Sequence, residues 1–110
     1  MTTIDTQVHG DAGAIALVEQ DGVAVLHLRG DVDSLAVAAW EAAAPSAARG
    51  AVAVDASGAT FLDCRGLRFL LRATAQTRRA GRLPELRCPS RSVRRLVEVA
   101  GAAPLFATVR

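Results

Sequence analysis

The sequence contains no tyrosine and only two cysteines, Cys64 and Cys88. Two cysteines are too few for a disulfide framework. With His9 and His27 as the only histidines, they also do not form the close set of four ligands that a structural zinc site needs. We therefore expect neither a metal site nor a cofactor in this chain.

Long apolar runs are also missing. The uncharged stretch Val99–Val109 has 11 residues and is broken by Gly101 and Pro104, whereas a membrane-spanning helix needs about 20 apolar residues. No lysine or arginine precedes Arg29, and the first dozen residues contain no compact apolar run, so the features of a secretory signal are absent. We expect a cytoplasmic protein without membrane insertion.

Enzyme and nucleic-acid motifs are absent as well. The sequence has no glycine-rich phosphate loop, no helix-turn-helix, no zinc finger and no aromatic RNA-binding platform. The aspartates are placed as turn and cap residues rather than as paired catalytic groups. We expect neither an enzyme nor a nucleic-acid-binding protein.

The residues that are present predict one globular domain. Of the 110 residues, 51% are apolar and 22% are charged, with a net charge of +2. The charge is unevenly distributed: residues 1–63 contain 2 arginines and 9 acids, whereas residues 64–110 contain 11 arginines and 2 acids. A nearly neutral total thus conceals a bipolar chain.

The apolar pattern predicts alternating strands and helices. The runs Ala14–Glu19 and Val23–Arg29, separated by Asp21-Gly22, indicate an antiparallel hairpin. The residues before it, Met1–Ala12, lack periodicity and are expected to form a flexible lead-in to a domain spanning residues 13–110. Asp33 or Ser34 can cap a helix that continues through Ala44. The other expected elements are a strand over Ala51–Ala56, a helix from Asp63 to about Ala80, a weaker strand over Leu83–Arg87, a helix from Pro89 or Ser90 to Gly101, and a strand over Leu105–Val109.

This element order predicts an α/β fold. Strands that alternate with helices favour right-handed crossover connections onto a largely parallel sheet. We expect a single domain with a four- to five-stranded mixed β-sheet and three main α-helices.

The helix after Asp63 combines a basic stripe with an apolar side. At about 100° per residue, one side carries leucines that are expected in the core, and Phe69 projects near the opposite, basic side. An aromatic residue among arginines is typical of a protein-binding hot spot. The alternative is a solvated basic face with Phe69 packed against a neighbouring loop. The stripe consists of Arg65, Arg68, Arg72 and Arg79.

Four segments, in this order and spacing, resemble the landmarks of STAS domains. They are Gly30-Asp31-Val32-Asp33, Val54-Asp55-Ala56-Ser57-Gly58, Phe61-Leu62-Asp63-Cys64-Arg65-Gly66-Leu67 and Val93-Arg94-Arg95-Leu96. The resemblance covers roughly residues 14–106. It implies a bacterial antagonist of an anti-sigma factor, which binds a kinase-like, ATP-binding anti-sigma factor, releases its sigma factor and is switched off by phosphorylation.

The family's phosphoacceptor position is occupied by Cys64 in this chain. A thiol is not the substrate of a serine kinase, and the next residue is Arg65 rather than serine. The consequence is constitutive binding, control by expression, or a redox response through Cys64, because the positive end of a helix favours a thiolate. A disulfide with Cys88 would need the two Cα atoms within about 7 Å. Whether Ser57 or Thr60 accepts the phosphate instead stays open.

The resemblance also indicates the partner-binding residues. In the leading hypothesis Asp63 caps its helix and offers a carboxylate, Phe69 supplies apolar contact area, and Asp31 and Asp33 shape the adjacent loop together with Gly30. Charge complementarity would come from Arg65, Arg68 and Arg72. A second hypothesis is the STAS subunit of a lipid-transporting ABC complex, which docks on the transporter ATPase without phosphorylation. A third is a redox-responsive or small-ligand regulator.

Overall fold

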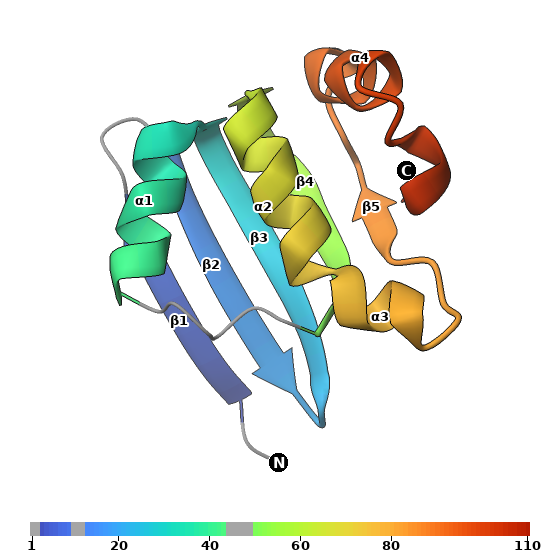
Figure 1. Cartoon of the computed structure of the whole chain (residues 1–110). Coiled ribbons are helices and arrows are strands. Elements are labelled where there is room, and N and C mark those ends of the chain that lie inside the picture. The colour runs from blue at the N-terminus through green and yellow to red at the C-terminus, as the bar shows by residue number, and fades with distance from the viewer. Residues whose placement is uncertain (1–2, 10–12, 44–49) are drawn as a thin grey trace.

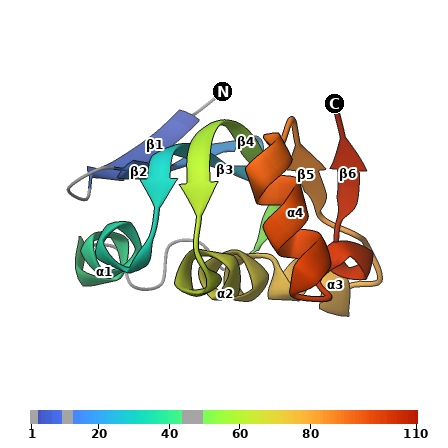
Figure 2. The same ribbon diagram turned by 90° about the horizontal axis from the view of Figure 1, so that it is seen from above.

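The computed structural model describes residues 3–9, 13–43 and 50–110 and shows a single mixed β-sheet with its helices on one face (Figures 1 and 2). Neighbouring strands in the sheet are also neighbours in the chain, in the order β1-β2-β3-β4-β5-β6. The first three strands pair antiparallel, and β3 to β6 pair parallel. The strands are β1 (Thr3–His9), β2 (Gly13–Gln20), β3 (Val23–Val32), β4 (Ala51–Leu62), β5 (Glu85–Arg87) and β6 (Ala107–Val109).

Four α-helices form the second layer. Two of them, α1 and α2, lie side by side over the sheet, and α4 lies beside β4 and β5 (Figures 1 and 2). The helices are α1 (Ser34–Ala43), α2 (Cys64–Ala73), α3 (Ala75–Arg79) and α4 (Arg91–Val99), followed by a short 3₁₀ turn, η1 (Ala103–Leu105). The predicted mixed α/β class with three main helices is confirmed.

The hairpin predicted at Asp21-Gly22 joins β2 to β3. Asp21 has φ 54° and Gly22 has φ 79°, the pair of positive angles that a tight two-residue hairpin turn needs. This turn sets the register in which Leu17 faces Leu26 and Ile15 faces Leu28. All four of these side chains are buried against the helices.

The prediction of a flexible lead-in is wrong for Thr3–His9. These residues form β1, and every one of them pairs with a residue of β2. The described sheet therefore has six strands rather than four or five. The lead-in's remaining residues, 1–2 and 10–12, lie outside the described part of the chain. The third predicted strand is also longer than expected, because β4 continues past Ala56 to Leu62 along β3, with three register shifts.

The single helix predicted from Asp63 to Ala80 is two helices that meet at Thr74. The Thr74 hydroxyl donates to the Leu70 carbonyl oxygen at 2.7 Å, and Arg78 donates to the same hydroxyl at 2.7 Å and to the carbonyl oxygen of Leu71. The Leu70 carbonyl oxygen thus accepts from both the N–H and the hydroxyl of Thr74, and the Arg78 side chain satisfies the Leu71 carbonyl oxygen where the first helix ends. As a result, Arg79 does not continue the stripe of α2.

The core lies between the sheet and α1 and α2. Trp40 from α1 and Phe69 from α2 are 1% and 5% exposed, and their rings meet edge to face with centroids 6.2 Å apart. This contact fixes the two helices to each other, because aromatic pairs in this geometry are favourable beyond the area they bury. The packing places the N-termini of α1 and α2 next to each other.

Candidate functional site

One corner of the molecule collects most of the residues singled out in the sequence. The parallel strands β3 and β4 end at the same edge of the sheet, and α1 and α2 begin there (Figure 1). In α/β sheets, this edge is where ligands and partners usually bind. We call this the corner surface and define it by Leu35, Phe61, Asp63, Cys64 and Arg65.

Asp63 ties the two helices together at this corner. One carboxylate oxygen, Oδ1, accepts a hydrogen bond from the backbone N–H of Gly66 at 2.7 Å and so caps α2. The other, Oδ2, accepts from the N–H of Ser34, the first residue of α1, at 3.2 Å. The predicted cap is confirmed. The carboxylate is engaged within the chain, and its geometry is that of a structural group rather than a free group offered to a partner.

Replacing Asp63 by alanine should destabilise the fold by about 2 kcal/mol, because the first turns of two helices each lose a hydrogen-bond acceptor. Urea unfolding of the purified variant measures this change. Ser90 caps only α4, by accepting from the N–H of Val93 at 3.3 Å, so Ser90→Ala serves as the single-cap control and should cost about 1 kcal/mol. Equal losses in the two variants would contradict the double role of Asp63.

The other two predicted aspartates are also structural. Asp33 accepts a hydrogen bond from the N–H of Ala36 at 3.0 Å, within the first turn of α1. Asp31 accepts from the Thr60 hydroxyl at 2.9 Å, which joins the ends of β3 and β4. Gly30, with φ 69°, precedes them. These contacts agree with the predicted role of shaping the loop beside Asp63.

Cys64 is the first residue of α2 and is exposed to solvent. Cys88 is also exposed, and both cysteines are free, so the disulfide considered from the sequence is not formed. The two alternative hydroxyls are already hydrogen-bonded: Ser57 donates to Asp55 at 2.7 Å and Thr60 donates to Asp31. Of Ser57, Thr60 and Cys64, only Cys64 lies at the N-terminus of α2.

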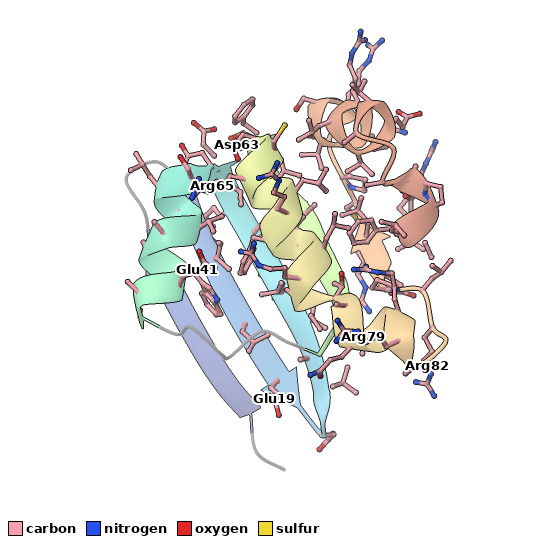
Figure 3. The ribbon with its side chains drawn as sticks, in the orientation of Figure 1. Glu19, Glu41, Asp63, Arg65, Arg79 and Arg82 are labelled. Atoms are coloured by element: carbon pink, nitrogen blue, oxygen red, sulfur yellow. The ribbon has the colours of Figure 1, made fainter. Side chains whose placement is uncertain are left out.

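The arginines of α2 do not form one uniform surface. Arg65 and Arg68 are exposed. Arg72 pairs with Glu41 of α1 at 3.0 Å, with both side chains about half exposed; such a surface pair contributes little to stability. Figure 3 shows Arg65 beside Asp63 at the start of α2, whereas Arg79 lies on α3. The arginines that a partner could contact near the corner surface are therefore Arg65 and Arg68.

The prediction that Phe69 is an exposed anchor is wrong. Its side chain is 5% exposed and packs against Trp40. The helical pattern of α2 places Phe69 on the flank between the arginines and the leucines, and α1 lies along that flank (Figure 1). The neighbouring helix buries a side chain that the isolated pattern assigns to solvent. The leucine side of α2 is core, as predicted, with Leu67 and Leu70 buried.

Two exposed apolar residues at the corner escaped the sequence analysis. Leu35, in the first turn of α1, is 56% exposed, and Phe61, near the end of β4 and opposite Asp31, is 49% exposed. Leu35 follows Ser34, whose backbone N–H donates to Asp63, and Phe61 lies two residues before Asp63 in the chain. The signal for Phe61 is an aromatic residue directly before Leu62-Asp63, within one of the STAS-like segments.

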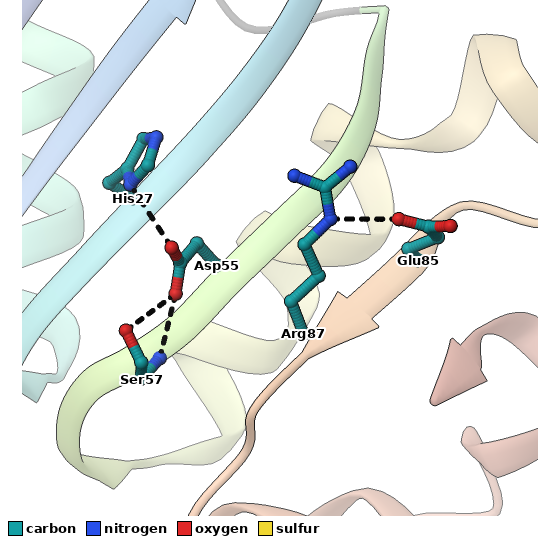
Figure 4. A network of polar contacts seen from close by, with 5 residues as sticks. All are labelled: His27, Asp55, Ser57, Glu85 and Arg87. Atoms are coloured by element: carbon teal, nitrogen blue, oxygen red, sulfur yellow. Dashed lines mark hydrogen bonds and ion pairs between the residues drawn. The ribbon is translucent and has the colours of Figure 1, made fainter. Parts of the chain in front are cut away.

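A second polar cluster lies on the sheet face that carries no helices (Figure 4). His27 Nδ1 lies 3.5 Å from Asp55 Oδ2, and Arg87 Nε lies 2.7 Å from Glu85 Oε1. Ser57 donates to Asp55 rather than to His27. A nucleophile must donate to its base to be activated, so this arrangement is a surface network and not a serine-histidine pair.

Asp55 has a pKa below its ordinary value. Partial burial alone would raise the pKa, but the hydroxyl and N–H of Ser57, together with the nearby charges of His27 and Arg87, favour the carboxylate and outweigh it. Because the pKa of Asp55 is lower in the folded state than in the unfolded state, the ionised carboxylate stabilises the fold when the pH is above the unfolded-state pKa. This stabilisation is lost as the pH falls through about 4 and below.

Ser57→Ala should therefore raise the pKa of Asp55 toward its ordinary value, since it removes the 2.7 Å hydroxyl contact. Titration of the Asp55 carboxyl carbon by NMR measures the midpoint in both proteins. Ser92→Ala, which changes a hydroxyl bonded to the Thr60 carbonyl oxygen instead, is the control. An unchanged midpoint in Ser57→Ala would show that the serine hydroxyl does not stabilise the carboxylate.

No helix within the residues that the structure describes is long and apolar enough to cross a membrane. No group of three or more potential ligands among histidine, cysteine, aspartate and glutamate could hold a metal ion in those same ranges.

Comparison with known families decides the classification. A family model described as "Mlab, STAS domain" matches residues 15–106, which span most of the chain. The chain belongs to the STAS family. Its STAS domain includes all four sequence segments that carry the resemblance, from Gly30 to Leu96, and the matched span contains every residue of the corner surface.

Solved structures support the same STAS fold. The anti-sigma factor antagonist SpoIIAA in its unphosphorylated form aligns with a TM-score of 0.64 at 20% identity, covering 87% of this chain and 88% of that one. An anti-sigma factor antagonist from Mycobacterium paratuberculosis aligns with a TM-score of 0.68 at 23% identity, covering 89% and 86%. No curated protein matches the chain.

Proposed function

We propose that this STAS domain is an anti-sigma factor antagonist, a binding protein rather than an enzyme. The observation that carries the proposal is the corner surface, where the exposed apolar side chains of Leu35 and Phe61 flank a rigid, doubly capped helix start. Exposed apolar groups on a fixed frame are well suited to protein binding, because little conformational freedom is lost on association.

The proposed partner is an anti-sigma factor of the kinase-like, ATP-binding type, met in the cytoplasm. The charge of Arg65 and Arg68 beside the apolar pair fits an acidic rim on that partner. The likeness to structures of anti-sigma factor antagonists supports an anti-sigma factor as the partner.

Cys64 determines how such an antagonist would be regulated. In the proposed system, phosphorylation at the head of α2 would add a charge of about −2 beside Asp63 and disrupt a fitted interface. The thiol of Cys64 does not accept a phosphate from a serine kinase. The corner surface then keeps its charge, and binding is constitutive with respect to phosphorylation.

A sigma-release assay tests the proposal. A preformed complex of the sigma factor and the ATP-binding anti-sigma factor from the same organism is titrated with the protein, and free sigma factor is measured by size-exclusion chromatography. The wild-type protein should release sigma, and Arg68→Glu should require about tenfold more protein. Arg82→Glu, which makes the same charge change at an exposed position distant from the corner (Figure 3), should behave as wild type. Failure of the wild-type protein to bind the anti-sigma factor would refute the proposal.

Cys64→Ser should restore a phosphoacceptor. The variant places a hydroxyl at the head of α2 with no other change in the corner, so incubation with the anti-sigma factor and ATP should yield a phosphorylated product with reduced sigma-releasing activity. Intact-protein mass spectrometry detects the modification, and the wild-type protein treated identically is the control. A variant that binds the anti-sigma factor yet stays unmodified would argue against a kinase-type partner.

A second candidate is the STAS subunit of a lipid-transporting ABC complex. The observation that favours it is Cys64 itself, since docking on an ATPase does not need a phosphoacceptor. Binding of the purified protein to the ABC ATPase of the same organism, with no binding to the anti-sigma factor, would establish this alternative.

If binding to either partner changed after mild peroxide treatment of the wild type but not of Cys64→Ala, the exposed thiol would be a redox control point.

A further inference from the structure

A groove lies between α4 and β6, on the side of the molecule away from α1. Two adjacent hollows of about 600 and 250 Å³ share Arg94 and Thr108 in their linings and together make up this groove. Its floor is apolar where Leu86 and Val97 are buried. Figure 2 shows α4 running alongside the last two strands, with β6 at the edge of the sheet.

The rim of this groove is strongly basic. Arg94 and Arg110 line it and are exposed, and Arg91 and Arg95 are exposed on the same helix. None of these four arginines takes part in an ion pair among the described residues. Glu98 is the only carboxylate side chain in the groove lining. Two lining arginines against one carboxylate, with two further arginines on the same helix, leave the local potential positive.

The outer edge of β6 offers backbone groups for pairing. The N–H of Ala107 donates to the Pro84 carbonyl oxygen, and the carbonyl oxygen of Val109 accepts from the N–H of Cys88, so both residues direct their backbone groups toward the β5 side. Because backbone groups alternate in direction along a strand, the N–H and C=O of the intervening Thr108 point to the outer edge. No strand among the described residues pairs there.

We propose that this groove binds an extended acidic segment of a partner protein, which pairs with β6 at Thr108 and places its carboxylates against Arg94 and Arg110. The strand edge supplies backbone hydrogen bonds, the apolar floor accepts alternate side chains, and the arginines select for negative charge. This site is distinct from the corner surface, and it does not depend on the identity of the partner that binds the corner.

A peptide fits these features better than a nucleic acid does. Single-stranded nucleic acids rely on aromatic side chains for base stacking, and the residues lining the groove include no aromatic side chain. The unpaired N–H and C=O of Thr108 match a peptide backbone in the extended conformation, which alternates the same two groups.

The test uses a fluorescent peptide of alternating glutamate and valine, about eight residues long, which matches an ordinary strand. Fluorescence anisotropy measures its affinity for the full chain at low salt. Arg94→Glu and Arg110→Glu should each weaken binding about tenfold, and Arg82→Glu is the charge-matched control with an unchanged groove. Hydrogen exchange of the Thr108 N–H, followed by NMR, should slow when the peptide is bound.

Several outcomes would contradict the proposal that the groove binds an acidic peptide. Absence of binding by the wild-type protein, equal binding of a lysine-valine peptide, or equal weakening by Arg82→Glu would overturn the proposal. Tighter binding of an oligothymidine probe than of the acidic peptide would assign the basic rim to nucleic acid. An unchanged Thr108 exchange rate in the complex would overturn the strand pairing. The sigma-release assay depends on the corner surface, so the two proposals fail separately.

Discussion

Phe69→Ala should lower the free energy of unfolding by about 3–5 kcal/mol and leave the partner affinity of the folded protein unchanged. The side chain is 5% exposed, and its ring meets Trp40 edge to face. Alanine removes that contact and leaves a cavity between α1 and α2 that the two packed helices cannot easily close. Urea unfolding measures the loss of stability, and partner affinity is then measured at a temperature where the variant is folded.

The matched variant at the surface should show the opposite pattern. Phe61 is 49% exposed, so Phe61→Ala should change stability by less than about 0.5 kcal/mol and weaken partner binding about tenfold. Leu83 is exposed to a similar extent, at 54%, but lies after α3 rather than at the corner. Leu83→Ala is therefore the control for a nonspecific loss of apolar surface. A loss of affinity in Phe69→Ala with normal stability would restore the hot-spot role that the buried position contradicts.

Gly66→Ala should destabilise the protein by about 3 kcal/mol or more, because no space exists for a methyl group at this position. A Cβ atom added to Gly66 would lie 2.3 Å from the backbone oxygen of Val32 and 2.6 Å from Leu62 Cδ1. The first of these contacts involves the backbone of β3, so α2 would have to move away from the sheet. That movement would also strain the hydrogen bond from the Gly66 N–H to Asp63.

A second glycine supplies the control for this experiment. A Cβ atom added to Gly50 would meet only the end of the Gln76 side chain, at 3.1 Å. Because that side chain can move, Gly50→Ala should change stability by less than about 1 kcal/mol. Thermal unfolding followed by circular dichroism compares the two variants. Similar melting temperatures would show that α2 does not approach β3 as closely as the structure indicates.

Local signals in the sequence predicted the elements whose causes are local. The Asp21-Gly22 turn, the Asp63 cap and the leucine side of α2 depend on neighbouring residues alone, and all three are confirmed. The end of the last helix follows the same rule, because Gly101 adopts φ 74° directly after it.

Features that depend on distant segments could not be predicted in this way. Phe69 is buried because α1 lies beside α2, and no periodicity within α2 contains that information. β1 is stabilised through pairing with β2 rather than through an apolar pattern of its own. Leu35 and Phe61 come to the same corner of the molecule only because β3 and β4 end at the same edge of the sheet.

The order of the sheet, in which each strand lies next to its neighbour in the chain, bears on how the protein folds. Forming any strand pair requires closure of no more than one hairpin or one helical crossover, so the entropy lost in each step is modest. Chains with such short-range topology fold faster than those whose strands are interleaved from distant segments. The pair β3 and β4 lies at the centre of the sheet and aligns eight residue pairs, as many as β2 and β3, so growth outward from it toward both edges adds one strand at a time.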